Sequence, residues 1–162
     1  MTLKELNTAT QPDEYPARFR RIMPFIYEWE CVLGKGGKVL VENDPSDPGG
    51  ETFCGLDRRS HPHLDFAKAT PESVTRVYLA DYWNKYKCGE YPDKLGECVF
   101  NCVVNAGWGR AAKILANGGK TADKFLDEQE AFYGRLVAAK PSSGKYLKGW
   151  LNRTGALRAL LK

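Results

Sequence analysis

The residues best suited to chemistry in this sequence lie between positions 28 and 55. Glu30 follows Trp29 near the end of an apolar helical stripe. An apolar wall disfavours the charged form of a carboxyl group, so such a group can donate a proton near neutral pH. Asp47 lies in a polar, glycine-rich turn whose backbone amides can keep it ionised, and Thr52 adds a hydroxyl that can hold a water. A protonated acid, an ionised carboxylate and a water-positioning hydroxyl suit hydrolysis of a glycosidic bond.

The same residues also have structural interpretations that involve no catalysis. A glutamate near a helix end is commonly a solvated surface residue, and Asp44 and Asp47 are typical formers of Asx turns. Glu42 is an alternative acid, but it falls in an expected strand with no apolar wall beside it. Residue types and spacing therefore leave both interpretations open.

The elements that must position these residues are a helix, a hairpin and a turn. Apolar residues recur at helical spacing between positions 18 and 33, with Pro24 predicting a kink or a helix start. Two short apolar runs around Gly34–Gly37 predict a β-hairpin over residues 32–43. The stretch N-D-P-S-D-P-G-G-E-T then predicts an ordered turn or a loop.

The rest of the chain is predicted to be helical. Thr70-Pro71-Glu72 has the cap, the N1 proline and the first-turn acid of a helix start, and Thr121 starts another helix. Further helices are expected over 93–104 and 108–117, and one or two short amphipathic helices over 149–162. We therefore expect a mainly α, α+β fold in one domain, 1–162, with residues 1 to about 15 as an N-terminal extension.

Composition agrees with a soluble globular protein. The chain has 162 residues, of which 43% are hydrophobic and 27% are charged. A chain of this length buries roughly two-thirds of its unfolded surface without disulfides. No run approaches the roughly 20 apolar residues of a membrane span, and the N-terminus lacks the apolar region of a secretory signal.

The cysteines and histidines predict neither a disulfide framework nor a metal site. The five cysteines are odd in number and form no C-x-x-C pair, so we expect reduced thiols. Cys98 and Cys102 share one helical face as small buried hydrophobes. His61 and His63 flank Pro62 without the convergent ligands that zinc requires, and we expect no metal and no other cofactor.

Charge is concentrated at the C-terminal end. Residues 131–162 contain seven basic side chains and no acidic one: Arg135, Lys140, Lys145, Lys148, Arg153, Arg158 and Lys162. Such a segment suggests a polyanionic partner, which would be a cell-wall polymer, an anionic membrane or nucleic acid. Because no helix-turn-helix, zinc finger or RNA-binding aromatic motif accompanies it, we expect no nucleic-acid partner.

The active-site region resembles a known family. W-E-C-V at 29–32 and N-D-P-S-D-P-G-G-E-T-F-C-G-L at 43–56 are similar to the active-site motifs of glycoside hydrolase family 108, bacterial and phage N-acetylmuramidases with a lysozyme-like fold. The resemblance runs from about 19 to 153 through D-Y-W at 81–83, F-N-C-V-V-N-A-G at 100–107, F-Y at 132–133 and K-G-W-L-N-R at 148–153. The chain departs from the family pattern in having Cys31-Val32 for Gly-Gly, extra residues before the acidic turn, and Asn101 for Asp.

The resemblance implies a muramidase that cleaves the β-1,4 bond between N-acetylmuramic acid and N-acetylglucosamine. Glu30 would be the general acid, with Asp47 and Thr52 holding a water or stabilising the oxocarbenium-like state. Asn105, Trp108 and Tyr133 would contact substrate, although helical spacing also predicts Trp108 and Tyr133 as packing residues.

The expected partner is the glycan strand of peptidoglycan, bound by a monomer. Because the N-terminus lacks an apolar region, we expect a protein made in the cytoplasm without a Sec signal, and the resemblance implies that it acts in the periplasm or outside the cell. Delivery then requires a holin, a virion or a secretion system, and a secreted toxin would have an immunity protein. The competing hypothesis is a catalytically inactive relative that binds the wall or serves as a structural or regulatory module.

Overall fold

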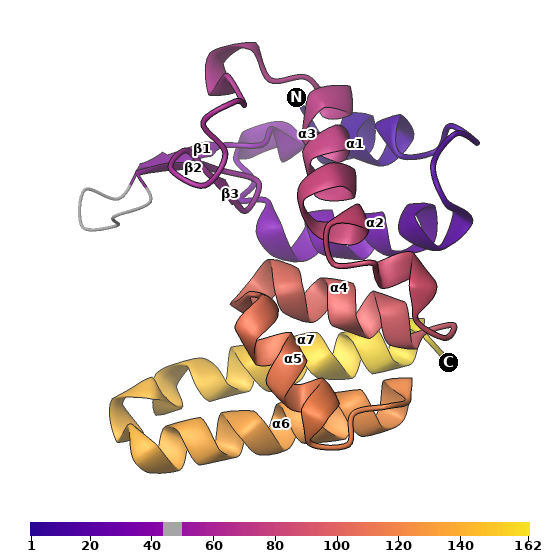
Figure 1. Cartoon of the computed structure of the whole chain (residues 1–162). Helices are drawn as coiled ribbons and strands as arrows, with labels where there is room; N and C mark the ends of the chain where they lie inside the picture. Colours follow the sequence, from indigo (N-terminus) through magenta and orange to yellow (C-terminus); the bar gives the residue numbers. More distant parts are fainter. Residues whose placement is uncertain (44–49) are drawn as a thin grey trace. The chain divides into compact units, whose positions relative to one another are not determined.

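The structure is a computed structural model that describes residues 1–43 and 50–162. The chain forms two compact units, residues 1–85 and 86–162 (Figure 1). Helices dominate both units, and a small three-stranded antiparallel sheet lies in the first, so the predicted fold class is confirmed. Within the described residues, no helix combines the length and apolar character needed to cross a membrane.

The first unit combines three α-helices with the sheet. Its elements are α1 (Leu3–Ala9), α2 (Ala17–Glu30), the 3₁₀ turn η1 (Lys35–Gly37), β1 (Val41–Asn43), β2 (Glu51–Phe53), β3 (Leu56–Asp57), η2 (Phe66–Lys68), α3 (Pro71–Val77) and the π-helix η3 (Tyr78–Asn84). Helix α1 packs against α2 and α3 and buries Leu6 completely. The sequence had not predicted this helix, although a reciprocal Thr2–Glu5 capping box starts it.

The helix starts predicted from capping residues are confirmed. The Thr70 hydroxyl accepts a hydrogen bond from the Ser73 amide, and the Ser73 hydroxyl accepts one from the Thr70 amide. Pro71 occupies the first helical position, where its missing amide costs no hydrogen bond. Helix α2 continues through Pro24 and buries Phe19, Ile22 and Ile26 of the predicted stripe. It ends at Glu30, so the prediction is wrong for Leu33, which lies beyond the helix and is 44% exposed.

The hairpin predicted over 32–43 forms only in part. The chain folds back around η1, where Leu33 bridges Val39 and two backbone hydrogen bonds flank that bridge, from Gly34 to Lys38 and from Leu40 to Val32. Gly36 and Gly37 both have positive φ, a turn conformation that glycine adopts readily and that interrupts the extended backbone between the two apolar runs. The sheet order is β1-β2-β3, so the end of the predicted hairpin pairs with residues 51–53.

The second unit is entirely helical in its described elements. It contains η4 (Cys88–Glu90), α4 (Leu95–Ala106), α5 (Trp108–Ala116), α6 (Ala122–Ala139), η5 (Pro141–Ser143) and α7 (Gly144–Leu160). Helix α4 is buried from Leu95 to Val103 and packs against α5 and α6, and α7 packs along α6 (Figure 1). The predicted Thr121 cap is present, and the C-terminal segment forms one helix that begins before the predicted residues.

Candidate active site

Glu30 is the last residue of helix α2. The Cys31 amide donates to the Tyr27 carbonyl at 2.9 Å and closes the final turn, after which Cys31 is extended and the chain leaves the helix. The Glu30 side chain is half-buried, and its Oε1 atom has no contact with solvent. The predicted position of Glu30 near a helix end is confirmed.

The turn between β2 and β3 lies against the Glu30 carboxylate. Phe53 pairs with Leu56, so Cys54 and Gly55 are the two central turn residues, with φ of 50° and 76°. Positive φ at both positions is what a type I′ hairpin turn requires. A Cβ atom on Gly55 would lie 2.8 Å from Glu30 Oε2 and 2.9 Å from Glu30 Cβ. The backbone therefore approaches the acid as closely as only glycine allows.

A disulfide joins the two segments that meet at this contact. Cys31 and Cys54 are bonded to each other, so the prediction of reduced thiols is wrong for this pair. The remaining three cysteines, Cys88, Cys98 and Cys102, are free and buried. Nothing in the local pattern signals the pairing, because residues 23 positions apart become neighbours only when α2 packs beside the hairpin turn.

Buried tyrosines support the turn from the inside. The Tyr78 hydroxyl donates to the Cys54 carbonyl at 2.6 Å, and it would also lie 2.9 Å from a Cβ on Gly55. The Tyr27 ring meets the Tyr78 ring edge-on at 5.9 Å, and the Tyr27 hydroxyl pairs with Thr75 at 2.8 Å. Burial raises the pKa of Tyr27, so it remains a neutral hydrogen-bonding group. Sequence reasoning assigned Tyr78 only to packing.

Thr52 lies in a polar row across one face of the sheet. Its register partners are Glu42 on β1 and Asp57 on β3, and directly paired residues share a face. The opposite face carries Val41, Phe53 and Leu56. Glu42 is exposed. Asp47 lies outside the described residues, so its placement stays a prediction.

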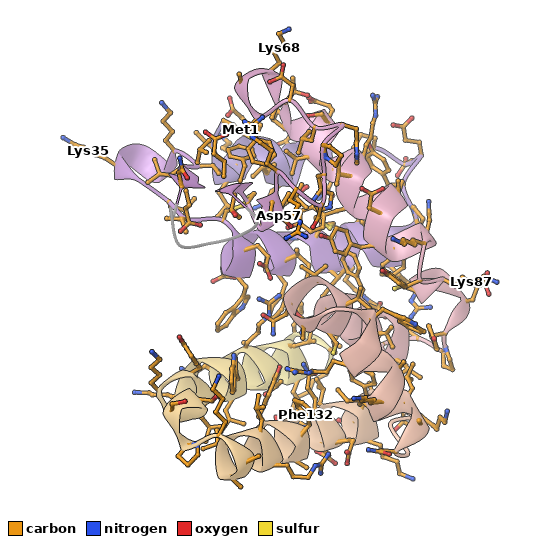
Figure 2. All side chains as sticks on the ribbon, turned by 60° about the vertical axis from the view of Figure 1, so that its left-hand side comes forward. Met1, Lys35, Asp57, Lys68, Lys87 and Phe132 are labelled. Atoms are coloured by element: carbon orange, nitrogen blue, oxygen red, sulfur yellow. A yellow bond between two sulfur atoms is a disulfide. The ribbon has the colours of Figure 1, made fainter. Side chains whose placement is uncertain are left out.

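Asp57 is a carboxylate that sequence reasoning missed. Burial alone would raise the pKa of Asp57, but the Ser60 backbone amide, the Ser60 side chain and the charge of His61 together lower it. The Ser60 amide donates to Asp57 Oδ1 at 2.8 Å. Asp57, which is labelled in Figure 2, is therefore an ionised carboxylate on the strand position that pairs with Thr52. In the sequence, the only signal was that Asp57 directly follows the T-F-C-G-L motif at 52–56.

The three predicted substrate-contact residues all lie in the second unit. Trp108 begins α5, is 38% exposed, and stacks on Tyr86 with ring centroids 5.2 Å apart. Asn105 is exposed near the end of α4. Tyr133 is 1% exposed and stacks on Trp150 at 4.9 Å, so its ring serves the packing of this unit.

A buried arginine organises the polar interior of the second unit. The Arg153 guanidinium donates to Asn101 Oδ1 at 2.9 Å and to Asn105 Oδ1 at 3.4 Å. Asn101, which replaces the aspartate of the family pattern, is therefore a neutral acceptor for a buried cation. The hydrogen bond from Arg153 orients the Asn105 side-chain amide, while Asn105 remains exposed to solvent.

Three of the seven basic residues near the C-terminus are held by other side chains. Arg135 pairs with Glu128 at 2.6 Å, Arg153 is buried, and Arg158 lies within 4 Å of three acidic residues of α6: Asp123, Asp127 and Glu130. The four lysines of the segment are exposed: Lys140, Lys145, Lys148 and Lys162. The positive surface is therefore smaller than the residue count suggests.

The histidine region forms a hydrogen-bonded cluster. The buried His61 contacts the Tyr82 hydroxyl through Nε2 at 3.2 Å, and Asp81 lies 3.4 Å from His63 Nε2. Across residues 1–43 and 50–162, no group of three His, Cys, Asp or Glu side chains is arranged to hold a metal ion.

Comparison with known proteins identifies a family match. The model of the glycosyl hydrolase 108 family matches residues 25–107, just over half of the chain, and this range includes Glu30, Thr52 and Asp57. Among solved structures, the chain is similar to that of Brucella abortus SagA, with a TM-score of 0.65 and 22% identity over 87% of this chain and 91% of that one. At this identity the likeness concerns the fold. A comparison with curated proteins found no match.

Proposed function

Because the chain belongs to glycosyl hydrolase family 108, a family of peptidoglycan-degrading hydrolases, we propose that it is an N-acetylmuramidase. The bond cleaved is the β-1,4 linkage between N-acetylmuramic acid and N-acetylglucosamine. The observation that carries the proposal is the Glu30 carboxylate, partly shielded at the end of α2 and in contact with the turn that follows Thr52. The substrate is a glycan strand of the bacterial cell wall.

In the proposed reaction Glu30 donates its proton to the glycosidic oxygen as the bond to the leaving sugar breaks. A carboxyl group positioned at the scissile oxygen acts as a general acid in glycoside hydrolysis. Asp47 and Thr52 hold the attacking water or stabilise the oxocarbenium-like transition state from the other side of the ring. The proton then returns to Glu30 from the incoming water or from solvent, which restores the acid.

Substrate contacts outside the reacting bond are proposed for Trp108 and Asn105. An exposed indole offers a flat apolar face for a sugar ring, and a primary amide can pair with an N-acetyl group. The four exposed lysines near the C-terminus provide additional attraction to the carboxylates of the peptide stems. That attraction is expected to weaken as salt is added.

The test is clearance of purified Gram-negative peptidoglycan by the wild type, Glu30→Gln and Glu42→Gln. Glu30→Gln keeps the shape of the side chain but removes the transferable proton, and loss of a general acid costs roughly 10²- to 10⁴-fold in rate. Glu42→Gln is the matched control, because Glu42 is exposed on β1. We expect only Glu30→Gln to lose activity, and products with muramic acid at the reducing end.

Three other outcomes would indicate a different acid, a different cleaved bond or a protein without catalytic activity. Loss of activity only in Glu42→Gln would make Glu42 the acid. Products with N-acetylglucosamine at the reducing end would replace the muramidase by a glucosaminidase. A folded wild type that binds peptidoglycan without clearing it would establish the non-catalytic wall-binding module.

A further inference from the structure

The disulfide lies beside the residue on which the proposed reaction depends. Cys31 directly follows Glu30, and Cys54 directly precedes Gly55, the residue that contacts the Glu30 side chain. The bond therefore connects the backbone on one side of this contact to the backbone on the other. Cys31 is 8% exposed and Cys54 is 1% exposed, so the link is inside the protein.

Glu30 needs an external constraint because of its position in α2. The last residues of a helix have carbonyl groups without helical partners and tend to fray. Beyond Cys31 the chain is extended, and the next two side chains, Val32 and Leu33, are 41% and 44% exposed. These two side chains therefore pack little, and the segment beyond the helix is held through its backbone by the Leu33–Val39 bridge and the flanking hydrogen bonds.

The hairpin turn is the rigid partner in this contact. Its two central residues are held by the Phe53–Leu56 pair and by the hydrogen bond from the buried Tyr78 hydroxyl to the Cys54 carbonyl. The disulfide joins the end of α2 to this anchored turn. Without it, the covalent link between the backbone next to Glu30 and the backbone next to Gly55 would be lost.

We infer that the Cys31–Cys54 disulfide is the positioning link for Glu30, and that it makes the hydrolase dependent on thiol oxidation. This inference rests on the proposed function. Two thiols form the bond by giving two protons and two electrons to a disulfide oxidant, which leaves as two thiols, and a dithiol reductant reverses the exchange. The enzyme is then weakly active where thiols are kept reduced and fully active in an oxidising compartment.

The first test compares oxidised and reduced wild type with Cys31→Ser/Cys54→Ser. A positional error near 1 Å costs roughly 10²-fold in rate. We therefore expect reduction to lower kcat by at least about 10-fold with little change in KM, while circular dichroism shows a folded protein. Reoxidation with oxidised glutathione restores kcat. The serine variant has the kcat of the reduced wild type and does not respond to reductant, which excludes an effect on the free cysteines.

Three outcomes would overturn the inference. One is an unchanged kcat in reduced, folded wild type. Another is a loss of activity that equals the fraction of unfolded protein at every reductant concentration. The third is a serine variant that folds and retains full activity. If the serine variant does not fold, reversible reduction of the wild type decides the question alone.

A second measurement separates this inference from the proposed function. The ¹³C signal of the Glu30 carboxyl, assigned with Glu30→Gln, reports the surroundings of the group without any substrate. Movement of this signal on reduction, with other glutamate signals unchanged, supports the positioning role even if no peptidoglycan is cleaved. A stationary Glu30 signal refutes that role even if the enzyme is an active muramidase.

Discussion

Gly55→Ala is expected to displace Glu30 and to reduce activity far more than it reduces stability. The new methyl group would lie 2.8 Å from Glu30 Oε2, whereas relaxed contacts between heavy atoms are about 3.5–4.0 Å. The carboxylate or the turn must therefore move by roughly 0.5–1 Å. A shift of that size predicts a loss of about 10- to 100-fold in kcat.

Stability changes through two separate causes. Gly55 has a φ of +76°, and a non-glycine residue in the left-handed region costs about 1–2 kcal/mol. Overpacking against Glu30 and Tyr78 adds about 1–3 kcal/mol. Gly36→Ala is the matched control, because Gly36 has a φ of +73° and would place its methyl group in open space.

The assay is peptidoglycan clearance, measured together with urea unfolding for both variants. We expect Gly36→Ala to show the backbone cost with wild-type kcat, and Gly55→Ala to show the additional cost together with the loss of kcat. Equal stabilities and equal kcat values in the two variants would refute the close contact between Glu30 and the turn.

Three further predictions concern charge, thiols and capping. Because its surroundings hold the pKa of Asp57 below its usual value, Asp57 stabilises the fold above about pH 4, and this contribution disappears as pH falls through the lowered pKa. Asp57→Asn should therefore lower the urea midpoint at pH 7 by an amount worth no more than about 1 kcal/mol and have no effect near pH 2. A larger loss of stability near pH 2 than at pH 7 would contradict the predicted direction of the pH dependence. Burial raises the pKa of Cys98 and of Cys102 to about 12, and Cys88 is fully buried, so native protein at pH 8 should not react with Ellman's reagent. Denatured protein should show three thiols, and protein both denatured and reduced should show five. Five thiols without reductant would mean that the disulfide does not form. Thr121→Ala removes the cap of α6 and should cost about 1 kcal/mol in thermal or urea unfolding, whereas Thr121→Ser should keep most of the stability.

Sequence reasoning succeeded where the signal is local. Thr70 and Thr121 start helices because their own side chains bond to amides three residues ahead, and that interaction needs no tertiary structure. The same rule would have found α1 from Thr2 and Glu5. The helix that carries Glu30 was predicted from an apolar periodicity, and α2 confirms it over residues 17–30.

The errors arise where distant segments decide the outcome. Residues 41–43 have the composition of a strand, but their partner strand comes from residues 51–53, so the pairing predicted with the nearer apolar run is wrong. The pairing of Cys31 with Cys54 likewise depends on how α2 meets the hairpin turn. An odd number of cysteines argues against a disulfide framework but does not exclude a single pair.

One physical explanation accounts for both the disulfide and the departure from the family pattern after Glu30. Where the family motif that the sequence resembles has Gly-Gly after the glutamate, this chain has Cys31-Val32, which places a thiol at the point where α2 ends. The Cys31 thiol can form a disulfide only with a second thiol on the turn, which Cys54 supplies. Cys54 has a φ of 50°, which is unfavourable for a residue with a side chain. Such strain persists where surrounding structure compensates for it, and here the Tyr78 hydrogen bond and the disulfide both converge on Cys54. Neither cysteine should therefore substitute for the pair: Cys31→Ser, Cys54→Ser and the double variant should lose kcat to the same extent, whereas additive losses would show two independent packing effects.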